Sequence, residues 1–293
     1  MRWGVSDNFT HRRGPILFES VPATPLAILK SSRYIVHMRI LLTNDDGIHA
    51  PGLEALHDEL LRLGPVDVVA PSVEQSGVSH SITYLEPLLV QDVFRHGKLF
   101  GHAVRGSPAD CVKLAMLQIC NMPPDLVVSG INAGANTGIN VLYSGTVAGA
   151  IEGAFFGITS IAVSLASCEN PDYRRAARLA VQLIEQIFAD ETRRGALWNM
   201  NLPESKPGWP IGVKMLPMGL ERYGEAMERR IDPRGRPYFW TKTVPQEEHK
   251  IEPGTDVEGV ADGYATLTPL HFDLTDRRRL AETAGPAWQL DDL

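Results

Sequence analysis

The sequence predicts an α/β fold whose core is a parallel sheet covered by helices on both faces, with a C-terminal antiparallel extension or arm. Three observations support this class. Strand-like and helix-like segments alternate from Met38 onward. Segments such as VDVVAP and SIAVSL are apolar enough to be buried on both faces of a sheet. Beyond Trp198, short strand-like pieces lie instead among prolines, glycines and charges.

The first elements are expected to run strand, helix, strand. The apolar run Arg39–Thr43 predicts a strand, and leucines at helical spacing predict a helix over Leu53–Leu63. Pro51 suits the first turn of that helix, and Gly64 suits its end. Val66–Pro71 then predicts a second buried strand.

Later elements continue this alternation. A helix is expected from Pro108 to about Cys120, because Ser107 is a good N-cap and Asp110 completes a capping-box-like pair. Short apolar runs predict buried strands, and an amphipathic pattern predicts the last helix. After a polar loop over residues 72–82, the other expected elements are extended segments near Tyr84–Val90 and Leu99–Val104, strands at Asp125–Ser129 and Ser160–Leu165, and helices at Thr146–Phe156 and Asp172–Ala189.

The chain ends do not follow this pattern. Residues 1–37 contain five Lys or Arg, two acidic residues and scattered prolines, with no clear period. We interpret them as a disordered leader or a mis-assigned start, because a secretory signal fits them poorly. The folded domain is expected at residues 38–275, of which about 198–275 include the arm, followed by a solvated tail at 276–293.

Composition narrows the class of partner. The 293 residues are 44% hydrophobic and carry a net charge of −7, with both signs mixed along the chain. This balance disfavours a nucleic-acid polymer or a membrane as the main partner. Three cysteines without metal-ligand spacing indicate a reduced, cytoplasmic protein. Glycines recur every four residues in the uncharged stretch Leu126–Ile151, but asparagines share that spacing, so a loop is expected rather than a membrane helix.

The stretch Asn44-Asp45-Asp46-Gly47 admits two interpretations. Asn, Asp and Gly are the residues that turns prefer, and Asp-Gly is a hairpin signal. A hairpin needs a second strand, whereas a helical leucine pattern follows here. In an open α/β sheet, the loop that leaves the carboxyl end of a strand is where ligands bind. The second interpretation is therefore a pair of carboxylates placed to hold a ligand.

Oxygen-bearing side chains follow three of the predicted parallel strands. The three loops offer first Asp45 and Asp46, then Ser76, then Asn132. Since the carboxyl ends of parallel strands meet at one edge of a sheet, these side chains are expected to lie close together. Their oxygens suit Mg²⁺ or Mn²⁺, or Ca²⁺, rather than a thiolate-loving metal. Taken singly, Ser76 is also explained as a turn residue and Asn132 as a brace of its own loop.

An anion site is expected beside these residues. Ser144-Gly145-Thr146 begins a predicted helix, where exposed N–H groups and the helix dipole favour phosphate, although an ordinary N-cap also explains it. A metal beside a phosphate site indicates phosphoryl chemistry, with water as the attacking group. The sequence contains no P-loop, dinucleotide-binding or esterase motif. His80 and His102 have no partners at a recognisable spacing, and we interpret both as structural.

Five motifs together resemble one known family. They are RILLTNDDGIHAPGLEAL, VVAPSVEQSGVSHSIT, GSPADCVKLA, PDLVVSGINAGANTGINVLYSGTVAGAIEGAFFGI and GYATLTPL. From Met38 to about Thr275, in this order, the chain resembles the SurE (survival protein E) family of metal-dependent 5′-nucleotidases. The resemblance implies a Rossmann-like, SurE-like three-layer core and one divalent metal ion per subunit, Mg or Mn. It also implies a cytoplasmic homodimer or homotetramer that exchanges the C-terminal arm.

The family's site residues fall on particular positions of this chain. The resemblance implies a metal site formed by four side chains, those of Asp45, Asp46, Ser76 and Asn132. Asp45 and Asp46 are also the implied catalytic residues. The implied phosphate-binding residues are Asn44, Asn136, Ser144, Gly145 and Thr146. Two departures from the family pattern, Ser107 for threonine and Gly149 for alanine, are expected to matter little. Gly149 is expected to loosen its helix slightly.

The resulting hypothesis is hydrolysis of nucleoside 5′-monophosphates to nucleoside and phosphate, with one aspartate also accepting a proton from the attacking water. Some members of the family also act on 3′-monophosphates and short polyphosphate. One rival is a nucleotide-sugar transferase that holds Mn²⁺ with the acidic pair, but no acceptor-binding domain is evident. The other rival is a metal–nucleotide sensor without turnover, which would suit an incomplete ligand set.

Overall fold

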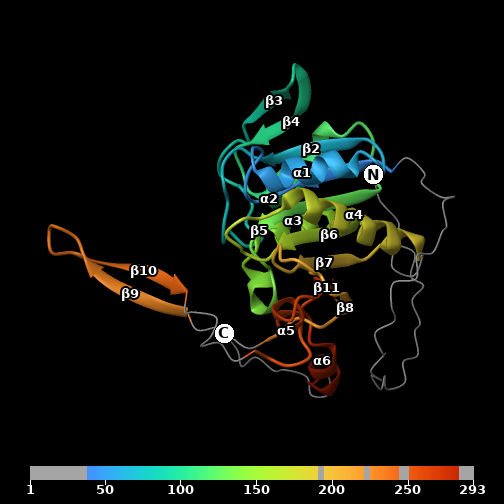
Figure 1. Cartoon of the computed structure of the whole chain (residues 1–293). Helices are drawn as coiled ribbons and strands as arrows, with labels where there is room; N and C mark the ends of the chain where they lie inside the picture. Colours follow the sequence, from blue (N-terminus) through green and yellow to red (C-terminus); the bar gives the residue numbers. More distant parts are fainter. Residues whose placement is uncertain (1–37, 191–194, 221–224, 244–250, 284–293) are drawn as a thin grey trace, which may run out of the picture. The chain divides into compact units, whose positions relative to one another are not determined.

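The core is a nine-stranded sheet, counted over the residues that the structure describes (Figure 1). This computed structural model describes residues 38–190, 195–220, 225–243 and 251–283. The strand order is β3-β4-β2-β1-β5-β6-β7-β11-β8. The strands are β1 Ile40–Thr43, β2 Val66–Pro71, β3 Val90–Arg95, β4 Lys98–Val104, β5 Leu126–Ala133, β6 Thr159–Leu165, β7 Leu197–Leu202, β8 Val213–Met215 and β11 Ala265–Leu270.

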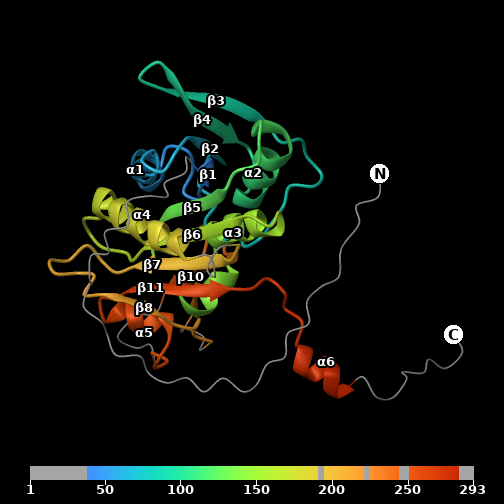
Figure 2. The ribbon, with the colours of Figure 1, turned by 90° about the vertical axis from the view of Figure 1, so that its right-hand side faces the viewer.

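Helices cover both faces of the sheet (Figure 2). On one face α1 lies beside α4, and on the other α2 lies beside α3. The α-helices are α1 Pro51–Leu60, α2 Pro108–Leu114, α3 Gly145–Phe155, α4 Tyr173–Ala189, α5 Asp256–Ala261 and α6 Arg277–Thr283. A π-helix at Ala115–Ile119 continues α2, and a 3₁₀ helix at Gly138–Leu142 precedes α3.

The central strand β1 shows why both faces are apolar. Ile40 and Leu42 belong to the apolar cluster that contains α1 and α4, whereas Leu41 belongs to the cluster of α2. All three side chains are fully buried, and each contributes about 1.5–3 kcal/mol to stability. β1 pairs in parallel with both β2 and β5, so the carboxyl ends of these strands meet at one edge. The predicted parallel core with two covered faces is confirmed.

Two expected elements differ in detail from the observed ones. The segment expected to be extended near Tyr84–Val90 is paired as a strand only from Val90, where β3 begins; β3 is largely exposed and pairs antiparallel with β4. The helix expected to reach Cys120 is α-helical only as far as Leu114 and then widens into the π-helix. Its predicted start is confirmed, since the side chain of Ser107 caps it within a complete capping box.

The uncharged stretch after residue 125 forms a strand, a loop and a short 3₁₀ helix. β5 extends to Ala133, four residues beyond the expected end at Ser129. None of the described helices is long and apolar enough to cross a membrane. Gly149 does not merely loosen α3. A Cβ there would lie 3.0 Å from Ser129 Oγ and from Thr43 Cγ2, so the glycine lets α3 pack closely on the sheet.

The C-terminal part adds strands in both directions. β7 is buried along its whole length and runs parallel to β6, although its sequence LWNMNL does not stand out as a strand. β11 is antiparallel to β7 and parallel to β8. β9 Glu225–Ile231 and β10 Pro237–Thr243 pair antiparallel as a separate two-stranded sheet. The predicted antiparallel extension is therefore confirmed, while β7 is an element that the sequence pattern missed.

The expected leader, residues 1–37, lies outside the described residues, as do residues 284–293 of the expected tail. The described part of that tail includes α6, which has no buried residue. Cys111 is buried and the other two cysteines are half-buried, and all three are free thiols. Cys111 therefore packs as a small buried side chain, as free cysteines commonly do.

Candidate active site

The turn after β1 holds the two predicted carboxylates. The side-chain amide of Asn44 donates a hydrogen bond to the carbonyl oxygen of Gly47 at 2.9 Å, and Gly47 has a φ of +96°, which favours glycine. α1 begins at Pro51, so no second hairpin strand follows. The hairpin interpretation is therefore wrong, and Asp45 and Asp46 lie on a tight turn at the carboxyl end of a central strand.

Asp45 is 5% exposed and lies against the start of α3. The Thr146 hydroxyl donates a hydrogen bond to Asp45 Oδ1. A Cβ on Gly145 would lie 2.8 Å from the Cβ of Asp45, so a larger residue could not sit here without a shift. Burial raises the pKa of Asp45 from 3.8 to about 6; the Thr146 hydrogen bond opposes this rise, and the charge of Asp46 adds to it.

Asp46 lies against the end of β5. Its Oδ2 accepts a hydrogen bond from the backbone N–H of Ala133 at 3.1 Å. The preceding residue is Asn132, whose Nδ2 donates to the carbonyl oxygen of Gly134 at 2.7 Å. The acceptor oxygen of the Asn132 amide is thereby left for another partner. Burial raises the pKa of Asp46, the Ala133 hydrogen bond opposes the rise, and the charge of Glu74 adds to it.

The loop after β2 returns to the acidic turn. The backbone N–H of Gln75 donates to the carbonyl oxygen of Asp45 at 2.7 Å. The hydroxyl of the next residue, Ser76, donates to Glu74 Oε1 at 2.6 Å. Because the hydroxyl proton is engaged in this way, the lone pairs of the serine oxygen remain available to a cation. The structure thus brings the Ser76 loop to the same edge as the two aspartates.

The predicted phosphate turn is the N-terminus of α3. Ser144 is buried and caps the helix by accepting a hydrogen bond from the N–H of Val147 at 3.1 Å. The loop before it is fastened to the Ser76 loop, since the N–H of Ser79 donates to the carbonyl oxygen of Tyr143 at 3.0 Å. The N-cap interpretation is correct, and it does not exclude an anion site. The first N–H groups of a helix have no partner within it and favour a negative charge.

Asn136 is held within the fold. Its side-chain Nδ2 donates to Ser164 Oγ at 2.9 Å, and its backbone N–H donates to Asn201 Oδ1 at 2.8 Å. Its carbonyl oxygen accepts from Nδ2 of Asn199 at 2.7 Å and of Asn201 at 3.2 Å. These bonds make Asn136 an anchor of the loop that leads to Ser144. Its expected contact with phosphate stays a prediction.

The two histidines have partners of their own. His80 Nε2 lies 2.8 Å from Glu152 Oε2, and Lys113 Nζ lies 3.5 Å from the other oxygen of that carboxylate. His102 Nδ1 lies 2.9 Å from Asp92 Oδ1. Glu152 is 3% exposed, and its contacts with His80 and Lys113 satisfy a buried carboxylate on α3. These contacts support the structural interpretation of both histidines.

The oxygen set fits a hard divalent cation. Two carboxylates with raised pKa values lie on adjacent residues, and no ion pair with Lys, Arg or His is present for either among the described residues. A cation between them would relieve the cost of burying their charges. The described residues contain no group of three or more His, Cys, Asp or Glu suited to a metal. The predicted set differs from such groups, since it combines two carboxylates with a hydroxyl and an amide.

Sequence reasoning missed three residues around this edge. Glu74 binds Ser76, as described above. Tyr173, the first residue of α4, has a pKa raised by burial and by the charge of Asp46. Asp256 is fully buried and binds the loop before α3 through the N–H of Gly138 at 3.1 Å. Of these three residues, only Glu74 could have been inferred from the local sequence, because it stands two residues before Ser76. The other two are more than 100 residues away from the turns that they approach.

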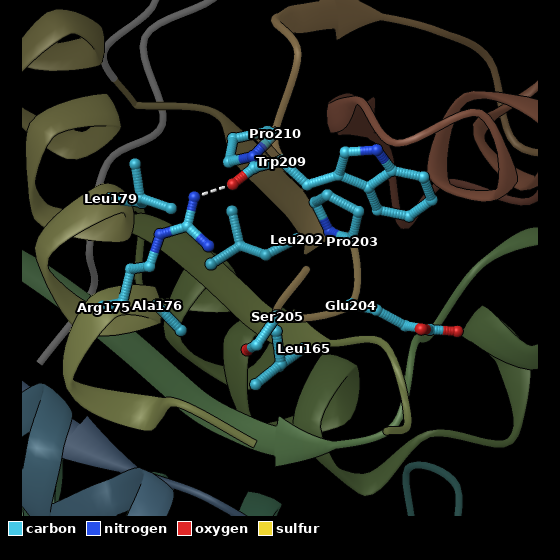
Figure 3. Close-up of a pocket in the computed structure, with 10 residues that line it drawn as sticks. All are labelled: Leu165, Arg175, Ala176, Leu179, Leu202, Pro203, Glu204, Ser205, Trp209 and Pro210. Carbon is cyan, nitrogen blue, oxygen red and sulfur yellow. Dashed lines mark hydrogen bonds between the residues drawn. The ribbon is translucent and has the colours of Figure 1, made fainter. Parts of the chain in front are cut away.

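A small pocket lies elsewhere, between α4 and the segment after β7 (Figure 3). It has a cavity volume of about 10 Å³, room for about one water molecule. The Arg175 guanidinium donates hydrogen bonds to the carbonyl oxygens of Lys206 at 3.2 Å and of Trp209. Two of its nitrogens are therefore engaged by backbone groups. None of the predicted site residues lines this pocket. The residues that line it are Leu165, Arg175, Ala176, Leu179, Leu202, Pro203, Glu204, Ser205, Trp209 and Pro210.

Fold and site together define a class of protein. Oxygen-bearing side chains and a helix N-terminus lie at the carboxyl edge of a parallel α/β sheet, an arrangement suited to cation-assisted chemistry on phosphate groups. A family model described as "Survival protein SurE" matches residues 40–225. The chain belongs to this family.

Similar proteins cover almost the same length. A 5′-nucleotidase SurE from Rhodopirellula baltica is 53% identical over 246 residues, which cover 84% of this chain and 97% of that protein. A 5′-nucleotidase SurE from Syntrophobacter fumaroxidans is 44% identical over 253 residues, covering 86% and 100%. The crystal structure of the SurE protein from Aquifex aeolicus matches with a TM-score of 0.73 and 38% identity, covering 84% of this chain and 98% of that chain.

Proposed function

We propose that this chain is a metal-dependent 5′-nucleotidase that hydrolyses nucleoside 5′-monophosphates to nucleoside and phosphate. The observation that carries the proposal is the position of the acidic pair. Asp45 is bonded to Thr146 at the start of α3, and Asp46 is bonded to Ala133 at the end of β5. A cation held by the pair would therefore lie beside an anion-binding helix end. The 5′-nucleotidase names of the two relatives support this reaction.

Each residue has a separate task in this proposal. One Mg²⁺ or Mn²⁺ ion per subunit would be held by four side chains, those of Asp45, Asp46, Ser76 and Asn132. When bound, the ion supplies Lewis acidity toward the phosphoryl group. The chain itself orients the substrate phosphate through five residues, Asn44, Asn136, Ser144, Gly145 and Thr146. One of the two aspartates accepts the proton of the attacking water.

The finer points of the proposal follow the family resemblance. We propose 3′-monophosphates and short polyphosphate as further substrates, and the cytoplasm as the location of the protein. Neither a nucleic-acid polymer nor a membrane is proposed as a partner, given the net charge of −7. Among the described residues, the 3′-monophosphates and polyphosphate would bind to the same groups as a 5′-monophosphate, namely the phosphate turn and the acidic pair.

The proposed homodimer or homotetramer forms through the C-terminal arm. The hairpin of β9 and β10 pairs only with itself among the described strands. A two-stranded sheet is marginally stable alone and normally needs a partner surface. Large apolar side chains of this hairpin are exposed by 40–66%, namely Met227, Ile231, Tyr238, Phe239 and Trp240. Burial of these side chains against a second copy would supply the missing surface.

A phosphate-release screen over nucleoside monophosphates tests the function. We expect release from at least one 5′-monophosphate with Mg²⁺ or Mn²⁺, none with EDTA, and recovery on addition of either metal. Transfer from a sugar nucleotide without release from any monophosphate would instead support the transferase. Binding of metal and nucleotide with no turnover would support the sensor. Either result would overturn the nucleotidase proposal.

A further inference from the structure

One fully buried carboxylate joins the candidate site to the C-terminal part of the chain. Asp256 is the first residue of α5 and is 0% exposed. Both of its carboxylate oxygens lie 3.1 Å from the backbone nitrogen of Gly138, which donates to them. Oδ1 also accepts from the backbone N–H of Gly219 at 3.0 Å. The bond to Gly138 spans 118 residues of sequence.

Gly138 lies on the path to the phosphate turn. It begins the 3₁₀ helix Gly138–Leu142, and Ser144 follows only two residues after that helix. The loop that contains it is anchored near one end by the asparagines of β7, which hold Asn136. Near the other end, the N–H of Ser79 donates to the carbonyl oxygen of Tyr143. Asp256 holds the middle of the loop between these two anchors.

Burying the carboxylate of Asp256 is energetically unfavourable. Removing its charge from water raises the pKa of Asp256, and the hydrogen bonds from Gly219 and Gly138 oppose that rise. Asp256 has no ion pair among the described residues, so hydrogen bonds from backbone N–H groups compensate its negative charge. Bonds between a carboxylate and N–H groups are stronger and more directional than neutral ones. They suit a position where a loop must stay in one conformation.

Gly219 extends the connection toward the arm. It follows β8 and lies six residues before β9, the first strand of the hairpin. One oxygen atom therefore accepts hydrogen bonds both from the loop of the candidate site and from the segment that leads to the hairpin.

We propose that Asp256 is a positioning residue for phosphate binding, which holds the loop 134–144 so that the N-terminus of α3 faces the bound phosphate. This rests on the proposed function of that helix end. A displacement of about 1 Å in a site of this kind is enough to cost about 100-fold in rate. A carboxylate that only stabilised the fold would affect folding and leave the affinity of the folded protein for phosphate unchanged.

The test compares Asp256→Asn and Asp256→Ala with the control Asp262→Asn. Asp262 ends the same helix and is exposed. Asn keeps one acceptor oxygen but presents an N–H group to a second donor, so the larger loss is expected for Ala and a smaller one for Asn. Measurements are the binding of inorganic phosphate and of Mn²⁺ by calorimetry, the kcat and KM for a nucleoside monophosphate, and the melting temperature.

We expect phosphate affinity and kcat/KM to fall about 10-fold or more in Asp256→Ala, within the range typical of residues that orient a site. Mn²⁺ affinity should stay within about threefold in both variants, because its proposed ligands lie outside the loop 134–144, and Asn132 is bonded to the first residue of that loop, Gly134, rather than to the part that Asp256 holds. Unchanged phosphate affinity in a folded Asp256→Asn or Asp256→Ala protein would overturn the proposal. Equal losses of phosphate and Mn²⁺ affinity would also overturn it.

Should Asp256→Ala fail to fold, Asp256→Asn still decides the question by the same two affinities. The wild-type protein separates this inference from the proposed function. A wild type that binds phosphate but hydrolyses no monophosphate refutes the nucleotidase proposal and leaves the phosphate-affinity comparison intact. An active wild type with unaltered Asp256 variants refutes only the positioning role.

Discussion

The carboxyl edge of the parallel strands and the C-terminal part of the chain contribute to the candidate site in different ways. The edge supplies the groups proposed to do chemistry, which stand near the ends of strands, in the loops that follow them, or at the start of α3. The C-terminal part supplies none of these. It supplies buried polar side chains on β7 and α5 that hold one of those loops, such as Asn201 and Asp256.

Reactive groups and the groups that hold them are subject to different structural requirements. A ligand set needs only that the carboxyl ends of neighbouring strands meet, which the α/β fold ensures. An anchor needs a particular donor and acceptor to meet across the fold at about 3 Å. The first requirement leaves compact motifs in the sequence. The second leaves only individual Asn or Asp residues that form no motif.

The largest effect is expected at the carboxyl edge itself. Asp46→Asn should reduce phosphate release by at least about 100-fold, since even residues behind a metal ligand cost about 10–100-fold when changed. The fold should survive, because the side chain keeps its size and an acceptor for Ala133. Circular dichroism and a phosphate-release assay check this. Asp58→Asn is the matched control, with a side chain 70% exposed, and full turnover by Asp46→Asn with metal present would contradict the assignment.

A second change separates chemistry from stability at the same edge. Folding raises the pKa of Asp45 from 3.8 to about 6, so the folded state binds this proton more tightly than the unfolded state. The stability of the metal-free protein is therefore highest below pH 3.8 with respect to this group, and falls as pH rises to about 6. Above pH 6 the loss is about 3 kcal/mol, from about 1.4 kcal/mol for each pH unit between the two pKa values.

Asp45→Asn removes that cost. In EDTA at pH 8 the variant should be more stable than the wild type by up to about 3 kcal/mol, with a smaller difference at pH 5 and little activity at either pH. Urea denaturation at the two pH values measures the effect. Adding Mn²⁺ should reverse the order at pH 8, because the ion stabilises only the protein that binds it. A variant less stable than the metal-free wild type at pH 8 would show that burying the charged Asp45 carboxylate does not destabilise the folded state.

A third change tests the C-terminal side of the comparison. Asn201→Ala leaves the N–H of Asn136 without its partner, so a loss of about 1–3 kcal/mol in the free energy of unfolding is expected. Inorganic phosphate should also bind less tightly, as the loop to Ser144 loses an anchor. The control is Asn140→Ala in the same loop, where the residue is exposed. Calorimetry with phosphate would contradict the role of β7 if both variants bound like the wild type.

The smallest effect on the folded subunit is expected in the hairpin. Replacing Phe239 and Trp240 with Ser should change the free energy of unfolding of the subunit by about 0.5 kcal/mol or less per site, because both side chains are about 60% exposed. The oligomer should instead dissociate, which sedimentation velocity detects. A Tyr84→Ser variant, exposed on a different part of the chain, serves as control. An unchanged sedimentation coefficient would remove the hairpin from the proposed interface.

Much of the fold could be predicted from the sequence, because its signals are local. The apolar runs of β1, β2 and β6, the cap at Ser107 and the leucine period of α1 each depend on neighbouring residues. The same holds for the candidate site, whose proposed ligands stand after β1, after β2 and at the end of β5. Asn132 was expected in the loop after its strand, but it lies within β5, paired with Ser164 of β6. The acidic turn needed only the helix after it to exclude a hairpin.

Tertiary structure alone decided the rest. β7 was missed because its two asparagines interrupt the apolar pattern, and they are buried only because Asn136 meets them. The segment expected to be extended near Tyr84–Val90 is paired as a strand only from Val90, where β4 offers a partner. Asp256 has no motif, since its donors stand 118 and 37 residues away. A sequence determines what is favourable among neighbours, whereas a buried polar group is favourable only with a partner that the folded chain brings to it.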